Sequence, residues 1–179
     1  MSTSLSPSPA RRETPLLIAF ADITRFMVNS QATPDAELAE LVNGYYCRAA
    51  SIISASGGRV VKFMGDAILA VWPEEKAGEG IEALAALKAD TDAWFSRQGW
   101  DSRLVVKAHF GTAVAGPFGP KGDERFDLIG NAVNVAATLP ARTFAISPDA
   151  FRKLSPEARK RFKKHTPPVV YIPAGDPRP

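Results

Sequence analysis

The sequence predicts an α+β sandwich, in which amphipathic helices pack on a mostly antiparallel sheet. Short apolar runs typical of buried strands alternate with two long stretches in which apolar residues recur every three to four positions. Two of the runs are separated only by Gly65-Asp66, a length and composition typical of a β-hairpin. The 179 residues contain neither an internal repeat nor a second composition regime, so we expect one folded domain.

The first elements follow from these patterns. Residues 1–15 mix Ser and Pro without an apolar period and are predicted to be a disordered tail, so the domain is placed at 16–179. The apolar run 16–21 predicts a first buried strand that ends at Asp22. From Pro34 the apolar period becomes helical, and Gly57-Gly58 is expected to end this helix.

The remaining elements are predicted in the same way. The β-prone runs 59–64 and 67–72 form the hairpin, and a second long helix follows at 78–97. The rest of the chain is predicted as strands at 103–109 and 112–115, a loop at 116–122, a short helix at 130–139, a strand at 143–147, a basic helical stretch within 151–165 and a last strand at 169–172.

Composition excludes several classes of protein. Apolar residues make up 45% of the chain and charged residues 23%, as in soluble globular domains. Cys47 is the only cysteine, which excludes an intramolecular disulfide and a Cys-based zinc site and indicates a reducing compartment. No apolar run reaches the roughly 18 to 20 residues needed to span a bilayer, and the N-terminus lacks the apolar stretch of a signal peptide. We therefore expect a cytoplasmic protein without a membrane partner.

The net charge of +3 is unevenly distributed. Residues 151–165 contain seven basic residues and a single acid, Glu157, so the rest of the chain is slightly acidic. Such a cluster indicates either a solvated surface or a site for an anionic ligand. No aromatic residues are interleaved on a predicted sheet face and no recognisable reading helix is present, so nucleic acid is not an expected partner.

Two acids stand where predicted strands end. Asp22 closes the first strand and Asp66 lies in the hairpin turn. If these strands are neighbours, both carboxylates point into one cleft, where they repel each other unless a cation lies between them. Oxygen-only ligation favours Mg²⁺ or Mn²⁺, with a phosphate-bearing substrate in the remaining positions. The alternative is that each Asp only caps a turn.

Four segments carry a family resemblance. FADITRF, KFMGDAILAV (62–71), HFGTAVAG (109–116) and FDLIGNAVNVAA (126–137) resemble, in order and spacing, the catalytic domain of the class III nucleotidyl cyclases. The resemblance extends from about Leu16 to Ser147, roughly three quarters of the chain. It implies a ferredoxin-like α/β sandwich and the conversion of a nucleoside triphosphate to a 3′,5′-cyclic nucleotide and pyrophosphate.

The resemblance also implies a metal site. Asp22 and Asp66 match the two aspartates that hold two ions, Mg²⁺ or Mn²⁺, and the backbone carbonyl of Ile23 matches a further ligand. One ion would lower the pKa of the ribose 3′-hydroxyl and position it against the α-phosphate, and the other would neutralise the triphosphate.

The resemblance also implies which residues contact the substrate. Lys62 and Asp127 match the pair that reads adenine, Lys62 by donating to a ring nitrogen and Asp127 by accepting from the exocyclic amine, so they favour ATP. Asn134 matches the residue that orients the ribose, and Phe26 stands in the segment after Asp22 whose backbone N–H groups would wrap the phosphates. In the family the metal aspartates and these residues come from different protomers, so a head-to-tail homodimer with two sites is implied.

The chain departs from the family pattern at the phosphates. Thr138 stands where the family usually carries an Arg that stabilises charge on the α-phosphate, and Arg25 and Met27 replace a common Gly and Thr. Arg25 is therefore a candidate source of the missing charge. Lys163 is the nearest match to a family Lys that reaches the terminal phosphates, with Lys164 and His165 as close rivals.

The sequence thus predicts an adenylate cyclase, with two alternatives left open. One is a cyclase for another nucleotide, GTP or a pyrimidine nucleotide. The other is a catalytically degenerate domain that binds nucleotide or only dimerises, for which Thr138 is the support. His109, in the middle of a strand, is interpreted as a core histidine, and the spaced glycines of 116–122 as a hairpin turn.

Overall fold

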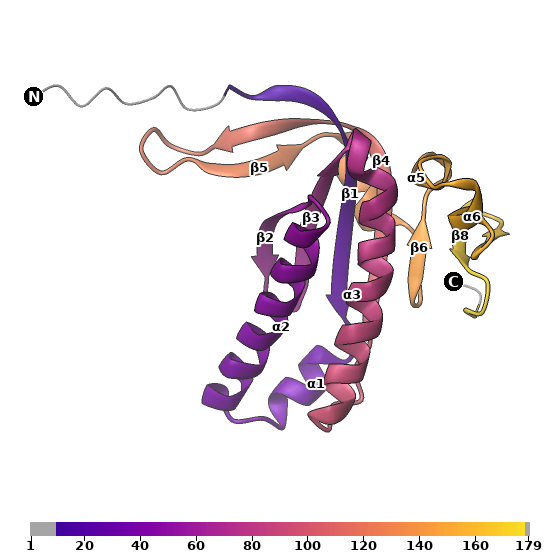
Figure 1. The fold of residues 1–179 in the computed structure, drawn as a ribbon. Coiled ribbons are helices and arrows are strands. Elements are labelled where there is room, and N and C mark those ends of the chain that lie inside the picture. Colours follow the sequence, from indigo (N-terminus) through magenta and orange to yellow (C-terminus); the bar gives the residue numbers. More distant parts are fainter. Residues whose placement is uncertain (1–9, 178–179) are drawn as a thin grey trace, which may run out of the picture.

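A computed structural model describes residues 10–177 of the chain (Figure 1). Its strands are β1 (Arg12–Ile23), β2 (Arg59–Met64), β3 (Ala67–Pro73), β4 (Leu104–Phe118), β5 (Arg125–Ile129), β6 (Phe144–Ile146), β7 (Phe162–His165) and β8 (Val170–Pro173). Its α-helices are α1 (Phe26–Gln31), α2 (Asp35–Ala55), α3 (Ala77–Arg97), α4 (Asn131–Thr138), α5 (Pro148–Arg152) and α6 (Pro156–Arg159), and a 3₁₀ turn, Glu74–Lys76, precedes α3.

The strands form one eight-stranded sheet in the order β2-β3-β1-β4-β6-β8-β7, with β5 paired to β4. Strands β4 and β6 run parallel, and the other described pairings are antiparallel. The long β1 lies between β3 and β4, so it is buried at the centre of the sheet. This architecture confirms the predicted α+β class with a mostly antiparallel sheet.

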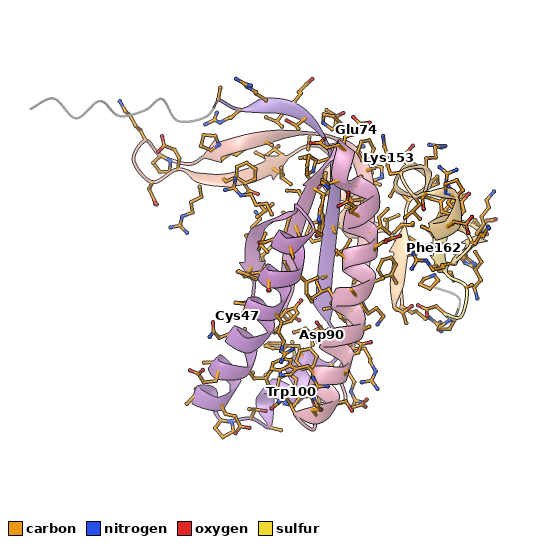
Figure 2. The ribbon with its side chains drawn as sticks, viewed as in Figure 1. Cys47, Glu74, Asp90, Trp100, Lys153 and Phe162 are labelled. Carbon is orange, nitrogen blue, oxygen red and sulfur yellow. The ribbon has the colours of Figure 1, made fainter. Side chains whose placement is uncertain are left out.

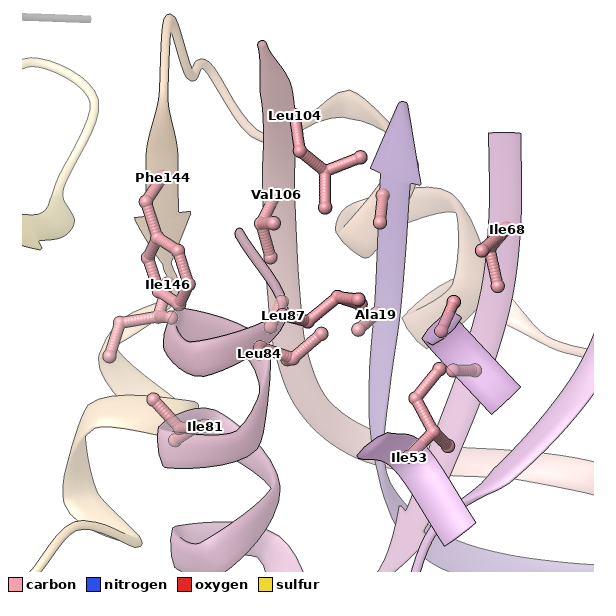
Figure 3. Packing of buried hydrophobic residues seen from close by; sticks show 14 of the residues in the cluster. Ala19, Ile53, Ile68, Ile81, Leu84, Leu87, Leu104, Val106, Phe144 and Ile146 are labelled. Carbon is pink, nitrogen blue, oxygen red and sulfur yellow. The ribbon is translucent and has the colours of Figure 1, made fainter. Parts of the chain in front are cut away.

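Helices cover both faces of the sheet. The long helices α2 and α3 lie side by side on one face, where Leu84 and Leu87 of α3 pack against strand residues such as Ala19 and Val106 (Figures 1 and 3). The short α4 packs on β1 and β4 from the other face, through Ala132 and Ala136. The alternation of side chains along the strands therefore supplies apolar residues to both layers.

Helix α2 illustrates how the sequence produces its element. Its buried residues, Leu41, Tyr45, Ala49 and Ile53, recur every four positions and form one stripe. The helix ends at Ala55, Gly57 follows the C-cap Ser56 with φ +77°, and Gly58 donates its N–H to the carbonyl of Ile53 at 2.9 Å. Both the stripe and the glycine end agree with the prediction.

The strands around β4 differ from the prediction. Instead of two strands followed by a loop, β4 runs unbroken to Phe118, and its last residues pair with β5, which was not predicted as a strand. The resulting hairpin projects from the body of the molecule (Figure 1). Strand β1 also begins early, because Arg12–Pro15 pair with residues 112–115 of β4. The predicted tail was therefore wrong at 12–15, and residues 1–9 of it lie outside the described part of the chain.

The basic stretch 151–165 does not form the predicted helix. Two short helices, α5 and α6, begin after Ser147 and Ser155, whose side chains accept from the N–H groups of Ala150 and Ala158, and strand β7 follows. Pro156 prevents continuation of α5, because proline lacks the N–H that a helix interior needs. The Lys153 Nζ donates to Glu74 Oε1 at 2.5 Å, in the 3₁₀ turn that precedes α3 (Figure 2). Within residues 10–177 no helix is both long and apolar enough to cross a membrane.

Candidate nucleotide and metal site

Asp22 and Asp66 are brought together by the pairing of their strands. Asp22, the second-last residue of β1, pairs with Ala67, the first residue of β3, and Asp66 directly precedes Ala67 in the β2–β3 turn. The backbone N–H of Ile23 donates to the carbonyl oxygen of Asp66 at 3.2 Å. Strand pairing therefore brings two carboxylates from separate parts of the sequence side by side.

The two carboxylates are electrostatically coupled. Burial raises the pKa of Asp22, and the negative charge of Asp66 and a side-chain hydrogen bond between the two acids raise it further. The positive charge of Lys107 and the backbone N–H of Ile23 act in the opposite direction on this pKa. A divalent cation would remove the repulsion, so this oxygen donor pair fits the predicted metal type. Within residues 10–177 no group of three or more His, Cys, Asp or Glu side chains is arranged to hold a metal ion.

The turn that carries Asp66 is held by helix α2. Tyr46 donates its hydroxyl to the carbonyl oxygen of Gly65 at 2.6 Å, and its ring stacks on Phe63 at 4.0 Å between centroids. Gly65 has φ +67°, a conformation that favours glycine. The neighbouring Tyr45 is buried, which raises the pKa of its hydroxyl, and the charge of Asp22 raises it further. Sequence analysis missed Tyr46, whose one available signal was its place beside the buried stripe of α2.

Lys62 and Asp127 form an ion pair. The Lys62 Nζ lies 2.6 Å from Asp127 Oδ2, with 42% and 32% of the two side chains exposed. Lys62 comes from β2 at the edge of the sheet and Asp127 from the projecting β5, two strands that do not pair with each other. The guanidinium group of Arg59 on β2 lies over the ring of Phe126 on β5, 3.7 Å from the ring centroid. This cation–π contact also holds β2 and β5 close together. The structure therefore brings the two predicted base-reading residues together.

Asn134 is exposed on α4, the helix that covers the face opposite α2 and α3. This helix approaches β4 closely, because a Cβ at Gly111 would lie 2.8 Å from the Cβ of Ala132. Thr138, four residues after Asn134, is also exposed, and its hydroxyl donates to the Asn134 carbonyl oxygen at 2.8 Å. The end of α4 therefore carries no positive side chain at position 138.

The segment after Asp22 forms helix α1 instead of the expected loop. Arg25 precedes it with φ +57°, a left-handed conformation that is uncommon outside glycine, and pairs with Asp101. The Phe26 ring packs against Trp100, with 6.0 Å between centroids, and joins the core on the α2–α3 face. In this chain Arg25 therefore forms an ion pair with Asp101, and Phe26 packs α1 against the core.

Lys163 is not near the aspartate pair of its own chain. It lies on β7, which the sheet order separates from β1 by β4, β6 and β8. Its Nζ donates to the backbone carbonyl of Asp176 at 2.8 Å. A contact between Lys163 and a nucleotide held by Asp22 and Asp66 would therefore need the other copy of the chain.

His109 lies half-buried on β4 beside the N-terminus of α5. Its Nδ1 is 2.8 Å from Ser147 Oγ, the hydroxyl that also caps α5. Burial lowers the pKa of His109, and the negative charge of Asp149 only partly opposes this shift. The contacts are those of a structural histidine, as the sequence analysis expected.

This shift predicts a pH dependence of stability. Between the lowered native pKa of His109 and the ordinary histidine pKa of 6.5, the unfolded chain binds more protons at this residue than the native chain does. The His109 contribution to the free energy of unfolding is therefore complete above about pH 6.5 and is lost as the pH falls below it. Urea unfolding measures the free energy of unfolding at pH 5.5 and at pH 8. The difference between these two values should be smaller for His109→Gln than for the wild type, and equal differences in the two proteins would contradict the prediction.

Comparison with known proteins adds independent findings. The family model for the adenylate and guanylate cyclase catalytic domain matches residues 9–163. Among curated proteins, the chain is 31% identical over 124 residues to an adenylate cyclase of Streptomyces coelicolor, covering 69% of this chain and 29% of that protein. It is 26% identical over 129 residues to adenylate cyclase 1 of Rhizobium meliloti, covering 67% of this chain and 19% of that protein. The chain thus spans less than a third of the length of these two relatives.

Solved structures show the same fold. A bacterial light-regulated adenylyl cyclase superposes with a TM-score of 0.79 at 24% identity, over 93% of this chain and 53% of that one. The adenylyl cyclase CyaB from P. aeruginosa superposes with a TM-score of 0.78 at 19% identity, over 95% of this chain and 98% of that one. The matched segments include the strands and turns that carry Asp22, Asp66, Lys62 and Asp127. The chain therefore belongs to the adenylate and guanylate cyclase catalytic domain family.

Proposed function

We propose that this chain converts ATP to 3′,5′-cyclic AMP and pyrophosphate. The observation that carries the proposal is the presence, in one fold, of the adjacent pair Asp22 and Asp66 together with the Lys62–Asp127 ion pair. The first pair is suited to metal-bound phosphates, and the second presents a donor and an acceptor to a base. The curated relatives named adenylate cyclase support the same reaction.

The metal site is proposed at the acidic pair. Asp22 and Asp66, with the backbone carbonyl of Ile23, would hold two Mg²⁺ or Mn²⁺ ions, which activate the ribose 3′-hydroxyl and neutralise the triphosphate. The coupled carboxylates fit such ions, because burial and then the charge of Asp66 raise the pKa of Asp22, and a divalent cation beside the pair would offset both effects. The nucleophile belongs to the substrate, so the residues of the chain supply position and charge without a nucleophilic side chain.

The other contacts are proposed from the positions of the side chains. Lys62 and Asp127 would read the adenine ring, one as donor and the other as acceptor, since their ion pair is exposed enough to open toward a ligand. Asn134, exposed on α4, would orient the ribose. Arg25 and Phe26 would line the phosphate segment, and Lys163 would reach the terminal phosphates.

We also propose a head-to-tail homodimer with two sites. Among the described residues, large hydrophobic side chains are exposed at six positions, Met27, Val28, Phe63, Met64, Ile129 and Val169. Five of these six lie within three residues of Arg25, Lys62 or Asp127 in the sequence, so exposed apolar side chains adjoin each of these three segments. Apolar surface rimmed by polar residues is typical of a protein interface. A second copy would cover it and bring Asp22 and Asp66 of one chain to Lys62, Asp127 and Asn134 of the other.

The alternatives differ in measurable ways. A cyclase for GTP, CTP or UTP would make a different cyclic product from the same site. A degenerate domain would bind nucleotide without making any product, and the neutral Thr138 is the observation that favours it. The ion pair of Lys62 with Asp127 favours ATP.

Product analysis across four nucleotides tests the proposal. The full chain is incubated with Mn²⁺ and ATP, GTP, CTP or UTP, and the products are identified by mass spectrometry. We expect cyclic AMP as the main product, and a kcat/KM for ATP about 10- to 100-fold lower in Lys62→Met, because loss of a charged hydrogen bond typically costs this much. Lys121→Met, which removes an exposed lysine near the tip of the β4–β5 hairpin, is the matched control. A preferred product other than cyclic AMP, or no product from any nucleotide, would refute the proposal.

A further inference from the structure

Lys107 lies on the same face of the sheet as Asp22. In the β1–β4 ladder Phe20 pairs with Lys107 and Asp22 pairs with Val105. Directly opposed residues share a face and every second residue returns to it, so Lys107 and Asp22 are diagonal neighbours. Such neighbours are typically about 7 to 8 Å apart, within the reach of a lysine side chain. The positive charge of Lys107 accordingly lowers the pKa of Asp22.

The ammonium group of Lys107 also contacts the end of α4. Its Nζ donates to the backbone carbonyl of Ala137 at 3.0 Å, in the last turn of the helix. Helix C-terminal carbonyls carry partial negative charge, so a cation is stabilised there. The charge therefore lies beside Thr138, at the end of the helix that carries Asn134.

Lys107 differs from the other basic residues of this region in its partners. Arg25 is paired with Asp101, and Lys62 is paired with Asp127. Across residues 10–177 no carboxylate lies within 4.0 Å of the Lys107 Nζ, whose hydrogen bond is to a neutral carbonyl. The Lys107 ammonium is half-buried, donates to a neutral carbonyl and has the Asp22 carboxylate only as a neighbour beyond ion-pair distance, so it can still bind an anionic ligand.

We propose that Lys107 is an anion-binding residue of the nucleotide site, which contacts the phosphate chain of the substrate and supplies positive charge that Thr138 lacks. The identity of the nucleotide rests on the proposed function, whereas binding of the phosphate chain does not. The bonds that change are those of the cyclisation: the 3′-oxygen bonds to the α-phosphorus, its proton passes to water, and pyrophosphate leaves.

Two variants separate the charge of Lys107 from its structural hydrogen bond. Lys107→Gln removes the charge but retains an N–H group that can donate to the Ala137 carbonyl, and Lys107→Arg retains the charge. Lys88→Gln is the matched control, because Lys88 is also partly buried and its Nζ donates to a backbone carbonyl, that of Leu104, at 2.7 Å. Lys88 belongs to α3, on the sheet face opposite α4.

Calorimetric titration of the full chain with inorganic triphosphate in Mn²⁺ measures the contact directly, and turnover of ATP is measured in parallel. We expect the Kd for triphosphate to rise about 10- to 100-fold in Lys107→Gln, to stay within about 3-fold of wild type in Lys107→Arg, and to be unchanged in Lys88→Gln. Thermal unfolding checks that each variant is folded. If Lys107→Gln does not fold, Lys107→Met, which also removes the charge, is titrated in its place: a rise in Kd of about 10- to 100-fold supports the contact, and a wild-type Kd contradicts it.

The outcomes distinguish the two proposals. A wild type that binds triphosphate but makes no cyclic nucleotide refutes the proposed function, and the binding series still decides the role of Lys107. Lys107 is not an anion-binding residue if the wild type does not bind triphosphate, if folded Lys107→Gln binds it like the wild type, or if Lys88→Gln loses as much affinity as Lys107→Gln.

Discussion

The Asp66→Asn variant is expected to turn over ATP at least about 10³-fold more slowly than the wild type, because metal ions supply several kcal/mol of transition-state stabilisation. The fold should be retained. The contact that positions the turn is made by the backbone carbonyl of Asp66, which accepts from the Ile23 N–H, and the substitution does not alter it. In the wild type the negative charge of Asp66 raises the pKa of Asp22, so the substitution removes the repulsion between these two carboxylates. Metal-free Asp66→Asn is therefore expected to unfold at the wild-type temperature or above it.

Steady-state turnover and thermal unfolding with and without Mn²⁺ test this expectation together. Added Mn²⁺ should raise the unfolding temperature of the wild type and have little effect on Asp66→Asn, since binding to the native state stabilises it. Asp90→Asn is the control, because Asp90 is paired with Arg48 between α2 and α3, away from the acidic pair. A variant at Asp66 that keeps more than a tenth of wild-type turnover would disprove the metal assignment.

Trp72→Ala is expected to lower the free energy of unfolding by about 3 to 5 kcal/mol, the usual cost of removing a large buried aromatic side chain. Trp72 is fully buried at the end of β3. It fills the space between the last turn of α2 and the start of α3, since a Cβ at Gly58 would lie 2.4 Å from its ring and one at Gly80 would lie 2.7 Å from it. Its Nε1 donates to Ser56 Oγ at 2.8 Å. The surrounding backbone is held by two helices and cannot collapse into the resulting cavity.

Urea unfolding followed by far-UV circular dichroism measures this loss. Trp72→Phe provides the graded comparison, because it keeps most of the packing and removes the hydrogen bond, and we expect a cost of about 1 to 2 kcal/mol. A loss below about 1 kcal/mol for Trp72→Ala would mean that the junction of β3, α2 and α3 is not the packed centre that the structure shows.

Local sequence patterns were sufficient to predict the helices and the turn in which apolar residues or glycines recur at a fixed spacing. The stripe of α2, the inward residues of α3 and the turn Gly65-Asp66 each follow from spacing and from the conformational freedom of glycine. The same reasoning located both aspartates at strand ends. These features depend on neighbours only a few positions apart, which is the range that a sequence pattern reports.

Long-range pairing decided the features that local patterns missed. The Gly-Pro segment after Ala115 has the composition of a loop, yet residues 116–118 extend β4 because β5 pairs with them. Residues 12–15 likewise become strand because β4 extends beside them. The basic stretch was predicted as helix from its composition, but Pro156 and the pairing of β7 with β8 override that preference.

The site divides in the same way. The sequence by itself was sufficient to identify the family and to name Asp22, Asp66, Lys62 and Asp127 as candidate site residues, because each lies in a motif of fixed local spacing. Only the tertiary structure decided the surroundings of these residues: Asp101 beside Arg25, Tyr46 over the Gly65 turn, and Lys107 between Asp22 and the end of α4. These contacts join residues 19 to 76 positions apart, and electrostatic interactions depend on distances in space that no spacing along the chain reports.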